Sequence, residues 1–136
     1  SLNVAKEIFK NSKVIKRFSF VAGDLFKVPF GNNVDTALYS NILHIYNKQQ
    51  NTKILKKINK SMNPGGRLIL VDYFLKKNLI EPFRAALFSL TMLLFTATGK
   101  TYTFEETESL LKNNGFGKLK RYELSQGCSA IEAIKI

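Results

Sequence analysis

His44, the only histidine of the chain, is the side chain best suited to accept a proton near neutral pH. It stands four positions after Ser40, where an apolar segment ends, and Asp72 ends another apolar segment. Asp24 follows a third such segment and precedes two apolar residues. A base near carboxylates suits a reaction in which a hydroxyl group loses its proton. Simpler interpretations stay open: Asp24 forms an Asx-turn, His44 caps a strand end and Asp72 ends a strand.

The elements that must position these residues are strands that alternate with helices along the chain. This alternation favours a layered α/β sheet. We expect strands at residues 18–22, 34–40, 67–74, 119–124 and 130–136, and the last two are expected to form an antiparallel hairpin. In open α/β sheets, ligands bind beyond the carboxyl ends of the strands. The sequence therefore predicts that Asp24, Ser40, His44 and Asp72 lie at one edge of the sheet.

Helices are expected at residues 3–11, 47–62, 82–96 and 103–114. Asn47 can cap the second helix, and a turn at residues 63–66 (Asn-Pro-Gly-Gly) ends it. Thr103 and Glu106 have the spacing of a capping box for the last helix. Residues 85–99 carry no charge but are too few to span a membrane, which takes about 20 residues. We expect that helix to be buried, to line an apolar pocket or to form a subunit contact.

The composition is that of one soluble globular domain of 136 residues with a net charge of +11. The 21 basic residues are mostly lysines on expected helix faces. A solvated lysine-rich surface is therefore favoured over a nucleic-acid interface, which stays an alternative. The first residues contain no signal peptide, and the single Cys128 indicates a reducing cytoplasm. No residue cluster has the spacing of a metal site.

Three motifs carry a resemblance to a known family. They are Val21–Ala22–Gly23–Asp24–Leu25–Phe26, the stretch from Tyr39 to His44, and the stretch from Asn63 to Asp72. In order and spacing they resemble the later half of class I S-adenosylmethionine-dependent methyltransferases. The resemblance is to the small-molecule O-methyltransferases, which include the plant phenol and acetylserotonin enzymes. It implies the C-terminal part of a Rossmann-like catalytic domain over residues 1–136, with a mostly parallel sheet, a final antiparallel strand pair and the first strands absent.

The resemblance also implies roles for individual residues. It places the S-adenosylmethionine adenine against Leu25 and Phe26, with its amine on Asp24, and puts Ser40 at the methionine or adenine portion. His44 becomes the base and Asp72 orients it or the substrate. Met92 falls where the family contacts the methyl acceptor, although simple core packing is the alternative for this residue.

Two departures from the family pattern concern the substrate. The His-Asp-Trp motif of the family is His44–Ile45–Tyr46 here, and Thr101 takes the place of a second carboxylate. Aromatic hydroxyl acceptors remain an expectation. So do two alternatives: a nitrogen or carbon acceptor, and a non-catalytic module with a methyltransferase-like shell.

The resemblance covers less than half of a typical family member, and the chain contains no Gly-x-Gly-x-x-Gly motif. We therefore expect the full-length protein, rather than this piece alone, to methylate a small molecule, and we expect a homodimer. In the family, further strands lie between the strands expected at 18–22 and 34–40. Those two strands are expected either to pair directly or to close the gap through another copy.

Overall fold

The computed structural model describes residues 2–136, with every side chain among them except that of Gln126. Ser1, at the start of the expected domain, lies outside the described residues. The helices and strands are α1 (Leu2–Phe9), β1 (Val34–Ser40), α2 (Lys48–Ser61), β2 (Met62–Asp72), α3 (Phe83–Phe95), α4 (Phe104–Lys112), β3 (Phe116–Glu123) and β4 (Ser129–Lys135). All the expected helices form within a few residues of their expected ends.

The four strands form one mixed sheet in the order β1-β2-β4-β3. β1 and β2 are parallel, and β4 is antiparallel to both β2 and β3, so β1, β2 and β3 run in the same direction. This arrangement confirms the α/β fold and the antiparallel hairpin, although β3 begins three residues earlier than expected, at Phe116 rather than at residue 119.

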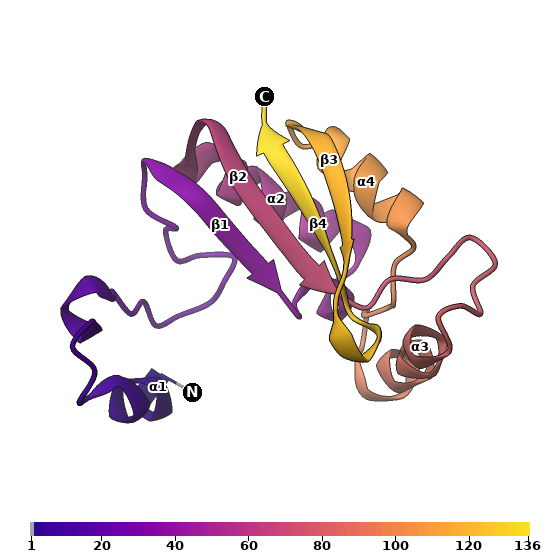
Figure 1. Ribbon diagram of the computed structural model, residues 1–136, viewed down its shortest axis with the longest axis horizontal. Coiled ribbons are helices and arrows are strands. Elements are labelled where there is room, and N and C mark those ends of the chain that lie inside the picture. The colour runs from indigo at the N-terminus through magenta and orange to yellow at the C-terminus, as the bar shows by residue number, and fades with distance from the viewer. Residues whose placement is uncertain (1) are drawn as a thin grey trace.

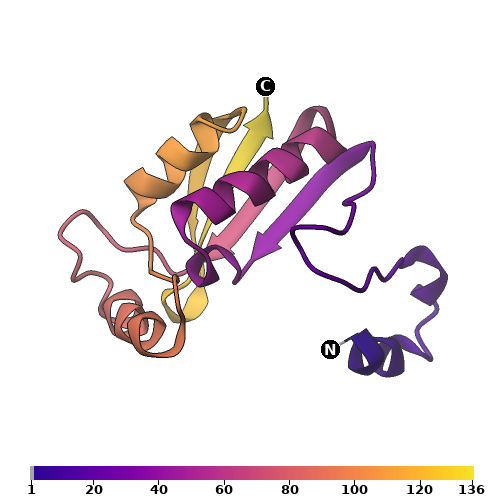
Figure 2. The same ribbon diagram turned by 180° about the vertical axis from the view of Figure 1, so that it is seen from behind.

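Helices α2 and α4 cover one face of the sheet (Figure 2). Ile54 and Leu55 of α2 are fully buried, as are Leu68 and Leu70 of β2, which alternate with less buried neighbours. Leu38 of β1 is 69% exposed on the opposite face. Figure 1 shows that face in front, with no helix of residues 2–136 across it. The sheet of the described residues is therefore covered on one side only.

The strand expected at residues 18–22 does not form, which corrects two expectations. The segment is extended, but no strand of the described residues runs beside it, and a strand requires a neighbour for its backbone hydrogen bonds. Phe18 stacks instead on Phe9 and Phe20, with ring centroids 5.0 and 6.2 Å apart. Direct pairing with β1 is therefore wrong for this structure.

Helix α2 ends before residues 63–66, as expected. These residues do not form a separate turn, however, because β2 already begins at Met62 and contains them as an irregular stretch. Met62 already pairs with Val34, and the register then shifts before Thr36 meets Arg67. Gly65 accommodates the detour with a φ of 74°, in the region that favours glycine.

Helix α3 lies beyond the carboxyl ends of β1 and β2 (Figure 1). Only Ala85 and Met92 of this helix are buried. Its remaining large apolar side chains are exposed or half-buried, and Leu93, Leu94 and Phe95 are at least 75% exposed. A fully buried helix is therefore excluded. No helix of residues 2–136 has the length and apolar character to cross a membrane.

Candidate active site

The parallel pairing of β1 and β2 brings their carboxyl ends to the same edge of the sheet. Ser40 ends β1 opposite Val71, and Asp72 is the next residue of β2. After β1 the chain turns sharply at Asn41, which has a φ of 55° and donates its N–H to the Val71 carbonyl at 2.9 Å. A short 3₁₀ turn, Leu43–Ile45, follows and carries His44. The topology thereby places His44 beside the end of β2.

His44 and Asp72 form a buried pair at this edge. Nδ1 of His44 lies 2.7 Å from Oδ1 of Asp72, and the His44 backbone N–H donates to Oδ2 at 3.3 Å. The Asp72 carboxylate is 1% exposed and also accepts the Tyr73 N–H at 2.8 Å. Because a carboxylate only accepts hydrogen bonds, Nδ1 of the neutral ring carries the proton. Nε2 is then left as a proton acceptor.

Aromatic side chains lie against the His44 ring. Phe88 of α3 meets the imidazole edge-on with a centroid distance of 4.8 Å, and it stacks on Tyr73 at 4.5 Å. A side-chain hydrogen bond with Cys128 is the main cause that raises the pKa of Tyr73. Met92 follows Phe88 by four residues, so both occupy one face of the helix. The surroundings of His44 are therefore largely apolar and aromatic.

The segment after α3 binds the backbone of His44. The Lys100 N–H donates to the His44 carbonyl at 2.9 Å. Gly99 packs so closely that a Cβ there would come within 2.4 Å of the same carbonyl and of Thr96 Oγ1. Thr101, which replaces a family carboxylate, is buried, and its hydroxyl has no hydrogen-bond partner among the described residues.

A buried polar network supports the other side of the His44 turn. Asn51 of α2 donates from Nδ2 to the carbonyls of Leu43 at 2.9 Å and Tyr46 at 2.8 Å. Its Oδ1 accepts the Tyr39 hydroxyl at 2.7 Å. The Tyr102 hydroxyl donates to the Tyr46 carbonyl at 2.7 Å. Burial raises the pKa of both tyrosines, which keeps their hydroxyl groups protonated as donors.

Asp24 is not at a strand end, because the preceding strand is absent. Its Oδ1 accepts the Phe26 N–H at 2.9 Å, which is the Asx-turn of the simpler interpretation, and Oδ2 lies 3.8 Å from Lys27 Nζ. Lys57 of α2 holds the loop through 2.8 Å hydrogen bonds to the Leu25 and Val28 carbonyls. Leu25 and Phe26 are half-buried against the core.

Contacts of Phe26 and Leu25 connect this loop to the rest of the edge. The Phe26 ring meets Tyr46 edge-on at 5.1 Å, directly beside the His44 turn. Leu25 helps to line an apolar cavity of about 270 Å³ between α2 and the free edge of β1. Ser40 is half-buried, and its hydroxyl accepts from Asn41 Nδ2 at 3.1 Å.

The structure thus brings some of the predicted site residues together and leaves others apart. His44 and Asp72 are in direct contact, Ser40 is beside them in the sheet, and Met92 lies one helical turn from Phe88, whose ring contacts His44. The hydrogen bonds and the ion pair of Asp24 among the described residues lie within its own loop. Within residues 2–136, no group of three or more His, Cys, Asp or Glu residues could hold a metal ion.

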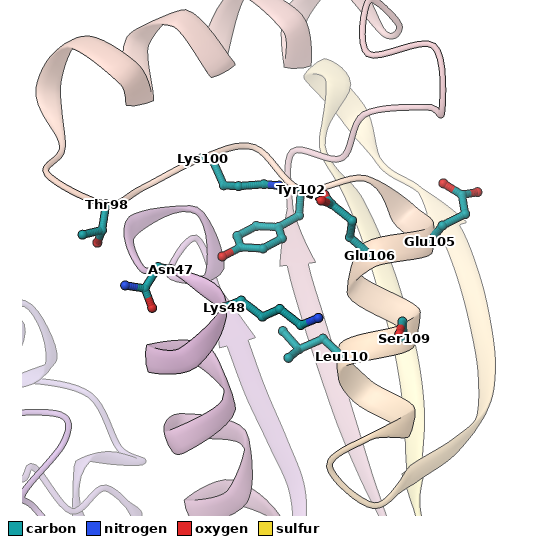
Figure 3. A pocket seen from close by; sticks show the side chains of 9 residues that line it. All are labelled: Asn47, Lys48, Thr98, Lys100, Tyr102, Glu105, Glu106, Ser109 and Leu110. Carbon is teal, nitrogen blue, oxygen red and sulfur yellow. Dashed lines mark hydrogen bonds and ion pairs between the residues drawn. The ribbon is translucent and has the colours of Figure 1, made fainter.

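Another cavity, of about 410 Å³, lies between the first turns of α2 and α4 (Figure 3). None of the predicted site residues lines it. Figure 3 shows Tyr102 pointing from the segment before α4 toward the start of α2. Lys100 and Glu106 beside it pair with each other at 2.6 Å. The segment 98–102, whose Lys100 N–H binds the His44 carbonyl, therefore forms one wall of this cavity.

Sequence reasoning missed Phe88, Tyr73, Asn51 and Tyr102. Phe88 could have been found, because it precedes Met92 by one helical turn, and Tyr73 directly follows Asp72. Asn51 also left a signal, since it is a polar residue on the stripe formed by Ile54 and Leu55. Tyr102 left none, because 56 residues separate it from the carbonyl it binds.

The chain is similar to known proteins over most of its length. The family described as "O-methyltransferase domain" matches residues 2–117. Norreticuline-7-O-methyltransferase of Papaver somniferum is 30% identical over 131 residues, which are 95% of this chain and 36% of that protein. The chain therefore spans little more than a third of the length of this relative.

Solved structures show the same partial coverage. An O-methyltransferase family 2 protein from Planctomyces limnophilus, in complex with apigenin, superposes with a TM-score of 0.90 at 28% identity, over 99% of this chain and 40% of that chain. Human N-acetylserotonin methyltransferase in complex with SAM gives a TM-score of 0.81 at 25% identity, over 93% of this chain and 36% of that chain.

Proposed function

The chain belongs to the O-methyltransferase domain family, and on that premise we propose that it is the C-terminal part of an S-adenosylmethionine-dependent catalytic domain. The full-length protein transfers a methyl group to a hydroxyl of a small molecule, and residues 1–136 alone are inactive. The observation that carries the proposal is the buried contact of 2.7 Å between His44 and Asp72 at the carboxyl ends of parallel strands.

The pair has the geometry of a general base and the carboxylate that orients it. S-adenosylmethionine, when bound, supplies a methyl group on a positively charged sulfur. Nε2 of His44 takes the proton of the acceptor hydroxyl as the oxygen gains the methyl group. Asp72 holds the proton of Nδ1 and stabilises the imidazolium that results.

Residues 24–26 and Ser40 fit one side of a cofactor site. Among the described residues, no group donates a hydrogen bond to Oδ2 of Asp24, and the side chain is 46% exposed, so Oδ2 can accept a bond from an adenine amine. Leu25 and Phe26 supply an apolar wall. Ser40 ends β1 beside Val71, where it can reach the amino-acid or adenine portion.

The aromatic surroundings of His44 favour an aromatic hydroxyl as the acceptor. Phe88 and Tyr73 stack on each other beside the imidazole, and Met92 lies on the same helix face as Phe88. A flat acceptor ring could pack against these side chains while its hydroxyl faces Nε2. Met92 is the residue we expect to contact the acceptor.

We also propose that the protein is a cytoplasmic homodimer that binds neither nucleic acid nor a membrane. The single cysteine supports a reducing compartment. The exposed apolar side of α3 supports a subunit contact. Cell fractionation tests the compartment. A binding assay at low salt tests whether the lysine-rich surface binds nucleic acid, and we expect it to retain neither DNA nor RNA.

The decisive experiment separates cofactor binding from catalysis in the full-length protein. Asp24→Ala should weaken S-adenosylmethionine binding roughly tenfold or more, because it removes a charge-assisted hydrogen bond. His44→Ala should lower turnover by about 10² to 10⁴ with little change in cofactor affinity, the usual range for a general base. Calorimetry measures the binding and radiolabelled methyl transfer measures the turnover.

Asp35→Ala is the matched control, because Asp35 is an exposed carboxylate of β1 whose side chain, within the part of the chain that the structure describes, binds only Asn63. It should change neither quantity. Unchanged turnover in His44→Ala would remove the base assignment, and unchanged affinity in Asp24→Ala would remove the adenine assignment.

A further inference from the structure

We propose that Asn51 is a positioning residue for the base: it fixes the 3₁₀ turn that carries His44 and so keeps the imidazole on Asp72. This inference rests on the proposed function, because positioning matters only if His44 is the base. No family motif quoted above contains Asn51. Its role follows from a set of contacts that converge on the turn from α2.

The two hydrogens of Asn51 Nδ2 bind both ends of the His44 turn. One meets the Leu43 carbonyl at 2.9 Å, directly before His44, and the other meets the Tyr46 carbonyl at 2.8 Å, two residues after it. An amide nitrogen has two hydrogens, and these short contacts use both. The third neighbour, the Tyr102 hydroxyl at 3.3 Å, is more distant.

The remaining atom of the amide is also engaged. Oδ1 accepts the hydroxyl of Tyr39 at 2.7 Å, which fixes the orientation of the amide plane. Asn51 is fully buried, and Tyr39 and Tyr102 are 5% and 4% exposed. A buried amide costs stability unless it is hydrogen-bonded, so a fully satisfied Asn51 holds one orientation only.

The two hydrogen bonds from Asn51 to the Leu43 and Tyr46 carbonyls, called the clamp here, act on His44 through the backbone of the turn. The His44 N–H and imidazole bind Asp72 of β2, while its carbonyl accepts from Lys100. These contacts fix His44 only if the turn keeps its shape. Asn51 attaches Leu43 and Tyr46 to the rigid helix α2, whose N-terminus Asn47 and Gln50 cap reciprocally. Loss of the amide should therefore loosen the contact between His44 and Asp72.

Nuclear magnetic resonance of the imidazole tests this without any methyl transfer. The Nδ1–H of His44 should give a slowly exchanging downfield signal in the 136-residue chain, since Asp72 accepts it. Asn51→Leu, which keeps the volume and removes the amide, should speed exchange of that proton roughly tenfold, the factor that corresponds to about 1.4 kcal/mol. The ¹⁵N shifts should show a larger share of the other tautomer.

Two controls separate this effect from a general loss of stability. Asn114→Leu makes the same chemical change at a second buried asparagine, whose Nδ2 binds the Leu110 carbonyl of α4. Ile131→Val weakens the core at a fully buried position of β4. Both should leave the His44 proton unchanged. Should Asn51→Leu fail to fold, Tyr102→Phe removes one of the two bonds to the Tyr46 carbonyl and should give a smaller change of the same kind.

A folded Asn51→Leu or Tyr102→Phe variant with an unchanged imidazole signal would overturn the proposal, as would an equal effect in the controls. In the full-length enzyme, Asn51→Leu should lower kcat several-fold to tenfold with the KM for S-adenosylmethionine unchanged. A changed imidazole signal in a protein that methylates nothing would contradict the proposed function and leave the clamp intact. A changed signal with unchanged kcat would contradict the positioning role.

Discussion

At the scale of single residues, the site depends on one carboxylate. Asp72 accepts the His44 ring, the His44 N–H and the Tyr73 N–H, and it is buried. Thr101 takes the place of a second carboxylate of the family, and its uncharged hydroxyl has no hydrogen-bond partner among the described residues. The orientation of His44 thus depends more on Asp72 than it would with two acidic partners.

Asp72→Asn should therefore lower kcat of the full-length protein by about 10² to 10⁴, because an amide can donate to Nδ1 and so favour the wrong tautomer. Cofactor affinity should change little, since Asp72 is assigned no cofactor contact. Steady-state kinetics and calorimetry measure the two quantities. Asp35→Asn, on an exposed carboxylate of β1, serves as the control. A kcat that stays within about threefold of the parent value would contradict the assignment of Asp72 as the residue that orients His44.

At the scale of the elements, the start of α4 determines how firmly residues 99–103 bind the His44 turn. Thr103 and Glu106 form a reciprocal capping box, with distances of 3.1 and 2.9 Å between side chain and backbone. The same segment contains Lys100 and Tyr102, which bind the His44 and Tyr46 carbonyls. The cap therefore stabilises both the helix and the support of the base.

Thr103→Ala should reduce the free energy of unfolding by about 1 kcal/mol, the usual cost of losing an N-cap side chain. Denaturant unfolding of the 136-residue chain measures this quantity. Thr52→Ala, in the interior of α2, is the matched control, because its hydroxyl binds only the Lys48 carbonyl of the same helix. A cost for Thr103→Ala no larger than that of the control would argue against the cap.

At the scale of the whole molecule, the chain presents two apolar surfaces. One is the open face of the sheet with Leu38, and the other is the outer side of α3 with Leu93, Leu94 and Phe95. Contiguous exposed apolar side chains often mark a contact with another protein. The homodimer proposal assigns the second surface to the contact between copies.

Light scattering of the 15.4 kDa chain should accordingly give the mass of a dimer, and Leu94→Glu should return it to a monomer. A buried carboxylate without a partner makes such a contact unfavourable. Leu38→Glu tests the competing surface on the sheet. A monomeric parent chain would contradict the proposal, and so would a dimer that only Leu38→Glu dissociates.

Local signals made much of this fold predictable. The caps of α2 and α4 depend on residues within three positions of each other, so Asn47 and Thr103 were identified from the sequence. Whether residues 18–22 form a strand depends on a neighbouring strand, which no local pattern reveals. The exposure of α3 likewise depends on what packs against it.

The candidate site was predictable to the extent that a topological rule applies. Strand ends of a parallel pair converge, and this rule brought His44 and Asp72 together although 28 residues separate them. The contacts of Tyr102 and Phe88 follow from the path of the chain after β2, which composition and periodicity do not determine. Asp24 was misplaced because its strand is absent.

Most of the hydrogen bonds that attach the turn around His44 to its neighbours are made by main-chain atoms of the turn. Asn51 binds the carbonyls of Leu43 and Tyr46, and Lys100 binds the carbonyl of His44. Such bonds are indifferent to the side chains at those turn positions. Ile45 and Tyr46 can therefore replace the aspartate and tryptophan of the family motif without moving the histidine. In evolutionary terms, the motif can drift around a histidine whose place is held by residues elsewhere in the chain, and a search for the motif alone would pass over such a site.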